Sequence, residues 1–357
     1  MSKRSVAVIF GGASSEYEVS LRSASFVISG VDREKYDLTM VGITKKGQWF
    51  FYTGPENAIA DDNWNRPEYV TPAVLPPDPS YHGLLVFEKD SLRTIPLDVI
   101  FPVLHGKNGE DGTIQGVFQM AQIPFVGCGV LSSAVCMDKA ITHTILDQAG
   151  VPNAMWADVY PWDLESFDEL EAELSDTLGY PMFIKPANAG SSVGVSKAVD
   201  KTALLEGLKL AFQHDGKAIV EEFIKGREVE CAVFGNHGAK ASVLGEIAPK
   251  KEFYDYEAKY EDDSTDLYIP ARIPAETADL VRELALAAFE SLGCEGLARV
   301  DFFVQDDGII LNEVNTLPGF TGISMYPKLM EHEGTPIPAL IDHLIALALE
   351  RTEKQHG

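Results

Sequence analysis

The sequence predicts an α/β protein with more than one domain. Its 357 residues exceed the roughly 150 residues expected of one domain. An apolar run at 6–10 ends in Gly11 and Gly12 and is followed by residues with helical spacing, which is how an α/β nucleotide-type fold begins. Apolar runs at 37–44 and 98–106 predict further buried strands.

The charge balance excludes several classes of partner. The chain has 54 Asp and Glu against 29 Lys and Arg, a formal net charge of −25. Nucleic acids and anionic membranes are bound mainly by clustered basic groups, so neither is expected as a partner. No apolar run reaches the ~18 residues of a membrane helix, and the opening run is too short for a signal peptide. Four scattered cysteines predict buried, reduced thiols, so we expect a cytoplasmic protein.

The remaining elements follow in order. Residues 45–95 are rich in proline and predict an irregular insertion, in which Trp49 and Trp64 pack locally. From about Asp138 a smaller second unit begins, with helices over 138–150, 163–178 and 200–213, strands over 180–187 and 218–224, and a loop over 188–198. A third unit has strands over 226–235 and 241–248, a helix over 275–293, a β-hairpin over 296–315 and a final helix over 336–350.

The hairpin carries the sharpest chemical pattern. Asp301 lies on its first strand, and Glu313 and Asn315 lie two residues apart on its second, so all three side chains can share one face. Such oxygen donors suit Mg²⁺ held together with nucleotide phosphates, whereas the alternative is a solvated acidic face. Arg299 shares that face and could neutralise a developing anion, or it could form an ordinary ion pair with Glu313.

A Gly/Ser loop follows the strand over 180–187. Gly190 and Gly194 permit close approach of a ligand to the backbone, and Ser191 adds a donor, so the loop resembles a phosphate cradle although the P-loop spacing is absent. Lys185, in the preceding strand, and Lys139, at the start of a helix, could each reach a phosphate. The alternatives are a plain turn and two solvated surface charges.

Four further side chains are candidates for ligand contacts. Glu221 and Glu228 flank a strand crossing where they could hydrogen-bond adenine and ribose, or they could be surface carboxylates on edge strands. Glu16 lies at the carboxyl edge of the first strands, where α/β ligand sites form, and could pair with an ammonium group or favour the helix dipole. His105 ends a strand and could face the same crevice or be structural.

Two loops complete the set of candidates. The aromatic and charged segment 253–266 lacks a clear period and predicts a lid, with Lys259 and Tyr260 at its middle. Farther on, the backbone N–H of Gly319 could bind an oxyanion, with Ser324 and Met325 beyond it. A Pro/Gly turn into a helix is the simpler reading of this second segment.

The order of these motifs resembles that of a known family. The segments GGASSEYEVSLRSA, HGKNGEDGTIQGVFQ, CMDKAIT, FIKPANAGSSVGVSK, EEFIKGREVECAV, EFYDYEAKY, GLARVDFF and NEVNTLPGFTGISMYPKL closely resemble the D-alanine–D-alanine ligases of the ATP-grasp superfamily, over nearly the whole chain. The resemblance implies a three-domain ATP-grasp architecture: an N-terminal parallel α/β domain over 1–137, with the 45–95 insertion of the longer bacterial form, a central domain over 138–222 and a C-terminal catalytic domain over 223–357.

The resemblance also implies a role for each candidate. ATP would be bound by Lys139, Lys185, Glu221, Glu228 and Lys259. Two Mg²⁺ ions, with Mn²⁺ as a possible substitute, would be held by Asp301, Glu313 and Asn315. The first D-alanine would meet Glu16, which forms a latch with Ser191 and Tyr260, and His105. The oxyanion would be bound by Arg299 and Gly319, and the carboxylate of the second D-alanine by Ser324 and Met325.

The implied activity is the ATP-dependent ligation of two D-alanines through an acyl phosphate, for peptidoglycan precursor synthesis, by a homodimer. Tyr260 favours an amine acceptor, because relatives that join D-alanine to D-lactate depart from tyrosine at this lid position. The alternatives are a ligase that joins D-alanine to D-lactate or D-serine, and a nucleotide-binding module that has lost catalysis. Arg299, Asp301, Glu313 and Asn315 are all present, which disfavours the second alternative.

Overall fold

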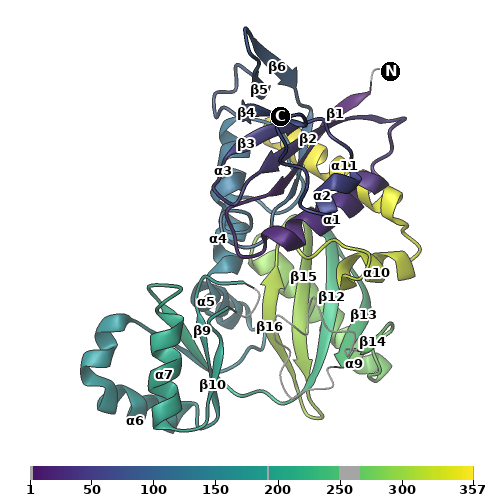
Figure 1. Cartoon of the computed structure of the whole chain (residues 1–357). Coiled ribbons are helices and arrows are strands. Elements are labelled where there is room, and N and C mark those ends of the chain that lie inside the picture. Colours follow the sequence, from purple (N-terminus) through teal and green to yellow (C-terminus); the bar gives the residue numbers. More distant parts are fainter. Residues whose placement is uncertain (1–2, 191–192, 249–265, 357) are drawn as a thin grey trace.

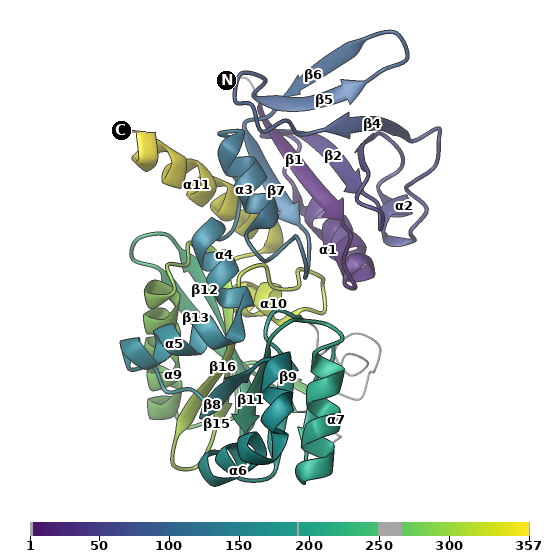
Figure 2. The ribbon, with the colours of Figure 1, turned by 90° about the vertical axis from the view of Figure 1, so that its left-hand side faces the viewer.

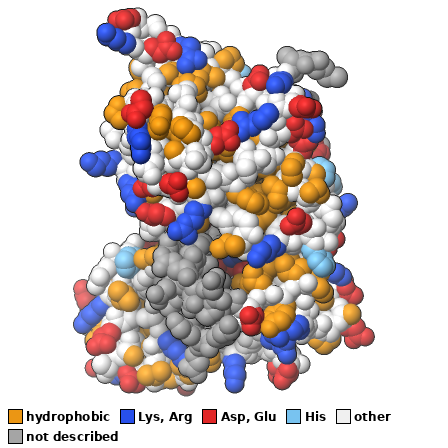
Figure 3. All heavy atoms as spheres, turned by 45° about the vertical axis from the view of Figure 1, so that its right-hand side comes forward, with side chains coloured by type: hydrophobic (Ala, Val, Ile, Leu, Met, Phe, Trp, Pro, Cys, Tyr) orange, Lys and Arg blue, Asp and Glu red, His pale blue; other side chains and the backbone are white. Residues whose placement is uncertain are grey.

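The chain forms three β-sheets in succession, each packed against helices (Figure 1). The computed structural model describes residues 3–190, 193–248 and 266–356. Three predicted site residues, Ser191, Lys259 and Tyr260, lie outside the described residues. Within the described part, no helix combines the length and apolarity needed to cross a membrane. Acidic and basic side chains are interspersed over the face in Figure 3.

The first sheet is mixed, with strand order β6-β5-β4-β3-β2-β1-β7. Its parallel part is β1 paired with β2 and β7, which confirms the predicted α/β start. The strands are β1 (Arg4–Gly11), β2 (Tyr36–Ile43), β3 (Trp49–Tyr52), β4 (Val70–Val74), β5 (Gly83–Phe87), β6 (Leu92–Pro96) and β7 (Val99–Val103). The helices of this part are α1 (Tyr17–Gly30), α2 (Asn57–Ala60) and α3 (Thr113–Met120).

The prediction that residues 45–95 are irregular was wrong. The segment supplies β3 to β6, which extend the sheet by antiparallel pairing. Each of these strands has only four or five residues, and two of them contain proline. Such short strands show too little alternation to be recognised between proline-rich turns.

Trp64 packs in the core as expected, against Tyr52 of the insertion, but its contacts also extend beyond the insertion. Its side chain is fully buried, with its ring edge-on to Phe10 at a centroid distance of 5.2 Å. The strand beneath it has Gly42, where an added Cβ would lie 2.3 Å from the indole ring. The indole N–H donates to the Tyr17 hydroxyl at 2.8 Å, and that hydroxyl donates to Asp62 at 2.8 Å. The insertion therefore reaches the first turn of α1.

Two helices lead into the second sheet, α4 (Val130–Met137) and α5 (Lys139–Ala149). Asp138 separates them and caps α5, because its carboxylate accepts from the Ile141 N–H at 3.2 Å. The sheet is antiparallel, with order β10-β9-β11-β8. Its elements are β8 (Trp156–Val159), a 3₁₀ turn (Pro161–Ser166), α6 (Phe167–Thr177), β9 (Met182–Pro186), β10 (Ser196–Ala198), α7 (Lys201–Ala211) and β11 (Ala218–Glu222).

The third sheet is also antiparallel, with order β14-β13-β12-β15-β16. Its strands are β12 (Arg227–Gly235), β13 (Lys240–Ala248), β14 (Asp266–Tyr268), β15 (Gly296–Val304) and β16 (Ile309–Asn315). The predicted hairpin is therefore β15 and β16. The helices are α9 (Ala275–Ser291), α10 (Met325–His332) and α11 (Ile337–His356).

The C-terminal helix α11 returns to the start of the chain (Figure 2). Its Ile341 belongs to the same buried core as Val27 and Ile28 of α1, and a Cβ added to Gly30 would lie 2.7 Å from Ile341. At the other end of the helix, Arg351 is buried and donates to the carbonyls of Gly127 and Phe125 at 2.6 and 2.7 Å. The first and last helices thus share one core.

Candidate active site

A cleft of about 320 Å³ lies where the three sheets approach one another. Its walls come from the loops after β1 and β7, the α4–α5 region, the loop after β9, the β15–β16 hairpin and the start of α10. The predicted site residues that line it are Glu16, His105, Lys139, Arg299, Glu313, Asn315, Gly319, Ser324 and Met325. A small pocket of about 30 Å³ shares Glu230, Asn312 and Glu313 with the cleft and adds Asp301 and Glu228.

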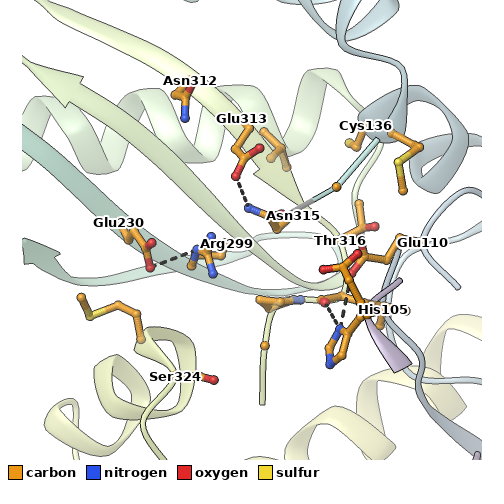
Figure 4. A pocket seen from close by; sticks show the side chains of 18 of the residues that line it. His105, Glu110, Cys136, Glu230, Arg299, Asn312, Glu313, Asn315, Thr316 and Ser324 are labelled. Carbon is orange, nitrogen blue, oxygen red and sulfur yellow. Dashed lines mark hydrogen bonds and ion pairs between the residues drawn. The ribbon is translucent and has the colours of Figure 1, made fainter. Parts of the chain in front are cut away.

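The hairpin brings the predicted metal ligands together, and Figure 4 shows two of them, Glu313 and Asn315, side by side. Asp301 lies opposite Glu313 in the β-ladder, and Arg299 lies opposite Asn315. The Asn315 amide donates to Asp301 at 3.1 Å and to Glu313 at 3.4 Å. Asp301 is buried, so this part of the hairpin is not a solvated face.

The oxygen donors of the hairpin fit a divalent cation that also binds phosphate. Two carboxylates and one amide offer the hard oxygen ligands that Mg²⁺ prefers. Within the described ranges, no three His, Cys, Asp or Glu side chains gather as a metal-binding group. The cation would therefore need oxygens from a bound phosphate or water to complete its coordination.

Arg299 is held by two carboxylates, Asp301 and Glu230, and the charge of Glu313, the alternative ion-pair partner, adds a smaller attraction. Its guanidinium forms two hydrogen bonds with Asp301, at 2.8 and 2.7 Å, and an ion pair with Glu230 at 3.0 Å. Burial alone would lower the pKa of Arg299, but Asp301 and Glu230 raise it well above its usual value. Arg299 is therefore a fixed positive charge at the cleft.

Lys185 and Glu221 form a buried pair at the inner strands of the second sheet. Their charged atoms are 2.6 Å apart, His143 lies 3.1 Å from the other carboxylate oxygen, and Lys185 also donates to Asn312 at 3.4 Å. Burial alone would raise the pKa of Glu221, but Lys185 and His143 lower it to about 2. Since β11 lies between β9 and β8, the surface-carboxylate alternative is wrong for Glu221.

Glu228 lies on β12, which is also an inner strand, between β13 and β15. It is half-buried and lines the small pocket with Asp301 and Glu313. The edge-strand alternative is therefore wrong for Glu228 as well.

Lys139 reaches the Gly/Ser loop from the start of α5. Its ammonium donates to the carbonyl of Ala189 at 2.7 Å, directly before Gly190. The side chain is half-buried and lines the cleft, so Lys139 is not a solvated surface charge. It therefore places a cation beside a loop that permits close approach of a phosphate.

Glu16 lies where the first sheet meets the Gly/Ser loop. Its carboxylate is buried and packed between two glycines, because a Cβ on Gly106 would lie 2.3 Å from Oε2 and one on Gly190 would lie 2.9 Å away. Any side chain at either position would displace the carboxylate. The two glycines therefore make room for an acidic group at the cleft.

His105 is buried and bonded on both ring nitrogens. Nδ1 lies 3.1 Å from the Leu317 carbonyl oxygen and 3.4 Å from Glu110, and Nε2 lies 3.0 Å from the Ser23 hydroxyl. Burial alone would lower the pKa of His105, but Glu110 raises it above its usual value. The cleft-facing and structural readings of His105 therefore both hold, since it lines the cleft and ties α1 to the loop after β16.

The start of α10 faces the cleft. The Ser324 hydroxyl accepts from the Thr321 N–H at 3.1 Å, and a Cβ on Gly319 would lie 3.0 Å from that oxygen. The Met325 side chain packs on β13, since a Cβ on Gly245 would lie 2.3 Å from its sulfur. The first turn of a helix leaves N–H groups without intrahelical partners at the positive end of its dipole, which suits a carboxylate.

Sequence reasoning missed several residues of the cleft. Glu230 precedes Cys231 in the segment GREVEC, two positions after Glu228, and period-2 spacing could have placed it on the same face. His143 contacts Glu221 of the second sheet from α5, and Asn312 of the third sheet accepts from Lys185 of the second, so local spacing indicates neither contact. Glu110 contacts His105 within the loop after β7, and this short spacing could have placed the two together.

The chain is similar to proteins of one family along its whole length. A family model described as "D-ala D-ala ligase N-terminus" matches residues 5–128, and one described as "D-ala D-ala ligase C-terminus" matches residues 145–346. D-alanine–D-alanine ligases from Ruminiclostridium cellulolyticum and Geobacillus kaustophilus are 49% and 46% identical, each over 99% of this chain and over 97% and 96% of their own sequences.

Solved structures agree with the family models. The VanG D-Ala:D-Ser ligase from Enterococcus faecalis matches with a TM-score of 0.89 at 43% identity, covering 97% of this chain and 100% of that one. The D-alanine–D-alanine ligase from Coxiella burnetii matches with a TM-score of 0.84 at 32% identity, covering 99% and 97%. The fold is that of the ATP-grasp ligases. Within that class, the chain belongs to the D-alanine–D-alanine ligase family.

Proposed function

We propose that this chain joins two D-alanines into D-alanyl-D-alanine at the expense of ATP, for peptidoglycan precursor synthesis. The observation that carries the proposal is the convergence of one fixed cation with two carboxylates and an amide on the β15–β16 hairpin, namely Arg299, Asp301, Glu313 and Asn315. Membership of the ligase family supports the same activity. We propose three domains, over 1–137, 138–222 and 223–357. The ATP site would lie between the second and third sheets.

ATP would be bound by lysines on α5 and β9 and by two acidic residues, Glu221 of the second sheet and Glu228 of the third. Lys139 and Lys185 would contact phosphate oxygens, with Lys259 approaching the γ-phosphate. Glu221 and Glu228 would accept hydrogen bonds from adenine and ribose. Because Glu221 stays ionised to about pH 2, it remains an acceptor at every physiological pH.

The hairpin would hold two Mg²⁺ ions through Asp301, Glu313 and Asn315. Bound Mg²⁺ offsets the negative charge of the transferring phosphoryl group. Arg299 lies on the same face and would contribute a further positive charge. Cross-strand pairing places Asp301 opposite Glu313 and Asn315 opposite Arg299, so a cation bound between these side chains would also face the phosphate oxygens.

The first D-alanine would bind with its ammonium at Glu16, and Ser191 and Tyr260 would join Glu16 in a latch. His105 would lie beside this substrate. The carboxylate of the first D-alanine attacks the γ-phosphorus of ATP. The bond between this phosphorus and the β,γ-bridging oxygen breaks, and ADP leaves with its electron pair. The product of this step is D-alanyl phosphate.

The second D-alanine would bind with its carboxylate at the start of α10, at Ser324 and Met325. Its deprotonated amine attacks the acyl carbon, and the oxyanion that forms would be bound by Arg299 and the Gly319 N–H. Phosphate then leaves and the dipeptide remains. Since water would hydrolyse the acyl phosphate, we propose that the segment around Tyr260 closes over the cleft.

The acceptor is the main alternative within the family. The VanG match is described as a D-Ala:D-Ser ligase, and such an enzyme would keep the ATP and metal residues and differ around Ser324, Met325 and Tyr260. We favour D-alanine because the curated relatives at 46–49% identity over nearly the whole chain are named D-alanine–D-alanine ligases. We further propose a homodimer acting in the cytoplasm, where ATP is supplied.

The test is ADP release with ATP and Mg²⁺, offering D-alanine, L-alanine, D-lactate and D-serine singly and each paired with D-alanine. We expect ADP and a dipeptide mass with D-alanine alone. ADP formation only after another acceptor is added would reject D-alanine as the acceptor. Glu313→Ala should abolish turnover, whereas Asp307→Ala, an exposed carboxylate at the hairpin turn, should not. Full activity of Glu313→Ala would remove Glu313 from the metal site.

A further inference from the structure

Three of the four cysteines gather beside the cleft. Cys136 lies in the last turn of α4, and Cys294 lies in the link between α9 and β15. Their Sγ atoms are 3.8 Å apart. Cys136 is half-buried and lines the cleft, where Figure 4 shows it on the wall formed by α4. Cys294 is buried behind it, and Cys128 is the third thiol of the group.

The contacts favour Cys136 over Cys128 as the partner of Cys294. Cys128 also contacts Cys294, but it is buried and its thiol donates to the carbonyls of Glu295 and Leu297, at 3.4 and 3.5 Å. Cys136 instead has its closest sulfur contact with Cys294. A disulfide bond measures about 2.05 Å, so the two sulfurs need to approach by less than about 2 Å.

We propose that Cys136 and Cys294 form a peroxide-sensitive dithiol at the wall of the cleft. The Cys136 thiolate attacks one oxygen of hydrogen peroxide, which breaks the O–O bond and leaves a sulfenic acid and one water. The sulfur of Cys294 then attacks the sulfenic sulfur, and a second water leaves as the disulfide forms. Two thiols lose two electrons, and one peroxide is reduced to two waters.

The order of the two steps follows from exposure. Cys136 lines the cleft, where small solutes can reach it, whereas Cys294 is buried and does not line the cleft. The contact with Cys128 lowers the pKa of Cys294, but the contact with Cys136 and burial raise it well above its usual value. Cys136 is therefore the thiol that peroxide meets first, and Cys294 is the resolving thiol.

The disulfide would act on the cleft through Lys139. Cys136 precedes Lys139 by three residues across the α4–α5 junction, and the Lys139 ammonium donates to the Ala189 carbonyl beside the Gly/Ser loop. Tying Cys136 to the third sheet would move this junction and disturb Lys139. This effect on Lys139 rests on the proposed function. It predicts that oxidation lowers kcat/KM for ATP and that dithiothreitol restores it.

The test is thiol mapping of the full-length protein after exposure to hydrogen peroxide, alkylation of remaining thiols and peptide mass spectrometry. We expect two of the four free thiols to be lost and one cross-linked peptide to join Cys136 to Cys294. Cys294→Ser should form no cross-link and keep its activity after mild oxidation, and the matched control Cys128→Ser should still form it.

Several outcomes would overturn the proposal. A cross-link from Cys294 to Cys128, or a Cys136 peptide carrying only sulfinic acid with Cys294 still alkylated, would reject the assigned pair. A mapped disulfide with unchanged kcat/KM would reject the link to Lys139 while keeping the modification site. Because thiol mapping needs no turnover, it tests whether Cys136 and Cys294 form a disulfide even if the ligase activity is absent.

Discussion

Replacing Trp64 by Phe tests whether the insertion supports the substrate side of the cleft. The indole N–H donates to the Tyr17 hydroxyl, and Tyr17 directly follows Glu16 at the start of α1. The Tyr17 hydroxyl also donates to Asp62. Phe keeps an aromatic ring over Gly42 but removes the N–H, so Trp64→Phe cuts one link between the insertion and α1.

The expected cost comes from two losses. The Tyr17 oxygen loses a buried hydrogen-bond donor, which costs about 1–3 kcal/mol. The smaller ring leaves part of a fully buried site empty, which adds about 1 kcal/mol. We therefore expect Trp64→Phe to destabilise the N-terminal part by about 2–4 kcal/mol. If about 1 kcal/mol of this destabilisation appears as weaker binding of the first D-alanine at Glu16, the affinity falls about fivefold.

The assay combines hydrogen exchange of the α1 amides with the KM for D-alanine at its first site. The matched control is Trp49→Phe, the same change at a half-buried tryptophan of the same insertion. Protection of α1 should fall in Trp64→Phe alone, and KM for ATP should stay unchanged. Equal exchange in both variants, together with an unchanged KM for D-alanine, would refute the link.

Three further predictions concern other parts of the molecule. Gly106→Ala should raise the KM for D-alanine more than tenfold in ADP release, because its Cβ would lie 2.3 Å from the Glu16 carboxylate and its φ is +70°; Gly116→Ala, where nothing lies within 4 Å, should match the parent enzyme. Arg351→Met should cost about 2–4 kcal/mol in urea unfolding, since two buried carbonyls lose a charged donor, and a loss below about 0.5 kcal/mol would contradict this. The pKa of Glu221 is lowered from 4.5 to about 2, so its ionisation contributes stability of the order of 3 kcal/mol. This stability is complete above pH 4.5 and is lost as pH falls toward 2. Urea unfolding of Glu221→Gln should therefore depend less on pH over that range.

Local patterns predicted the hairpin and its chemistry because period-2 alternation and a short polar turn fix both the strands and the face that they share. Arg299, Asp301, Glu313 and Asn315 could therefore be grouped before the fold was known. Glu230 could not be added in the same way, because it joins Arg299 only through the pairing of β12 with β15. That register depends on the whole third sheet, not on neighbouring residues.

The insertion was mispredicted for a different reason. β3 pairs with β2 at the edge of the parallel part, and β4 pairs with β3, so these strands are stabilised by their neighbours and not by a strong pattern of their own. Proline and glycine between them indicate turns correctly, but they hide how regular the intervening residues become. Likewise, the partners of His143 lie on different elements, so its environment follows from assembly of the sheets.

The shared core of α1 and α11 bears on how the protein is made. A nascent chain exposes its first helix long before its last helix leaves the ribosome, and N-terminal units usually fold first. Here β1 and α2 can cover most of the apolar side of α1 early, but the part at Val27 and Ile28 that packs with Ile341 stays open to water until synthesis is nearly complete. Chaperones that shield apolar segments would therefore act on the beginning of this chain, and a truncation that removes α11 would uncover part of the first sheet as well as part of the third.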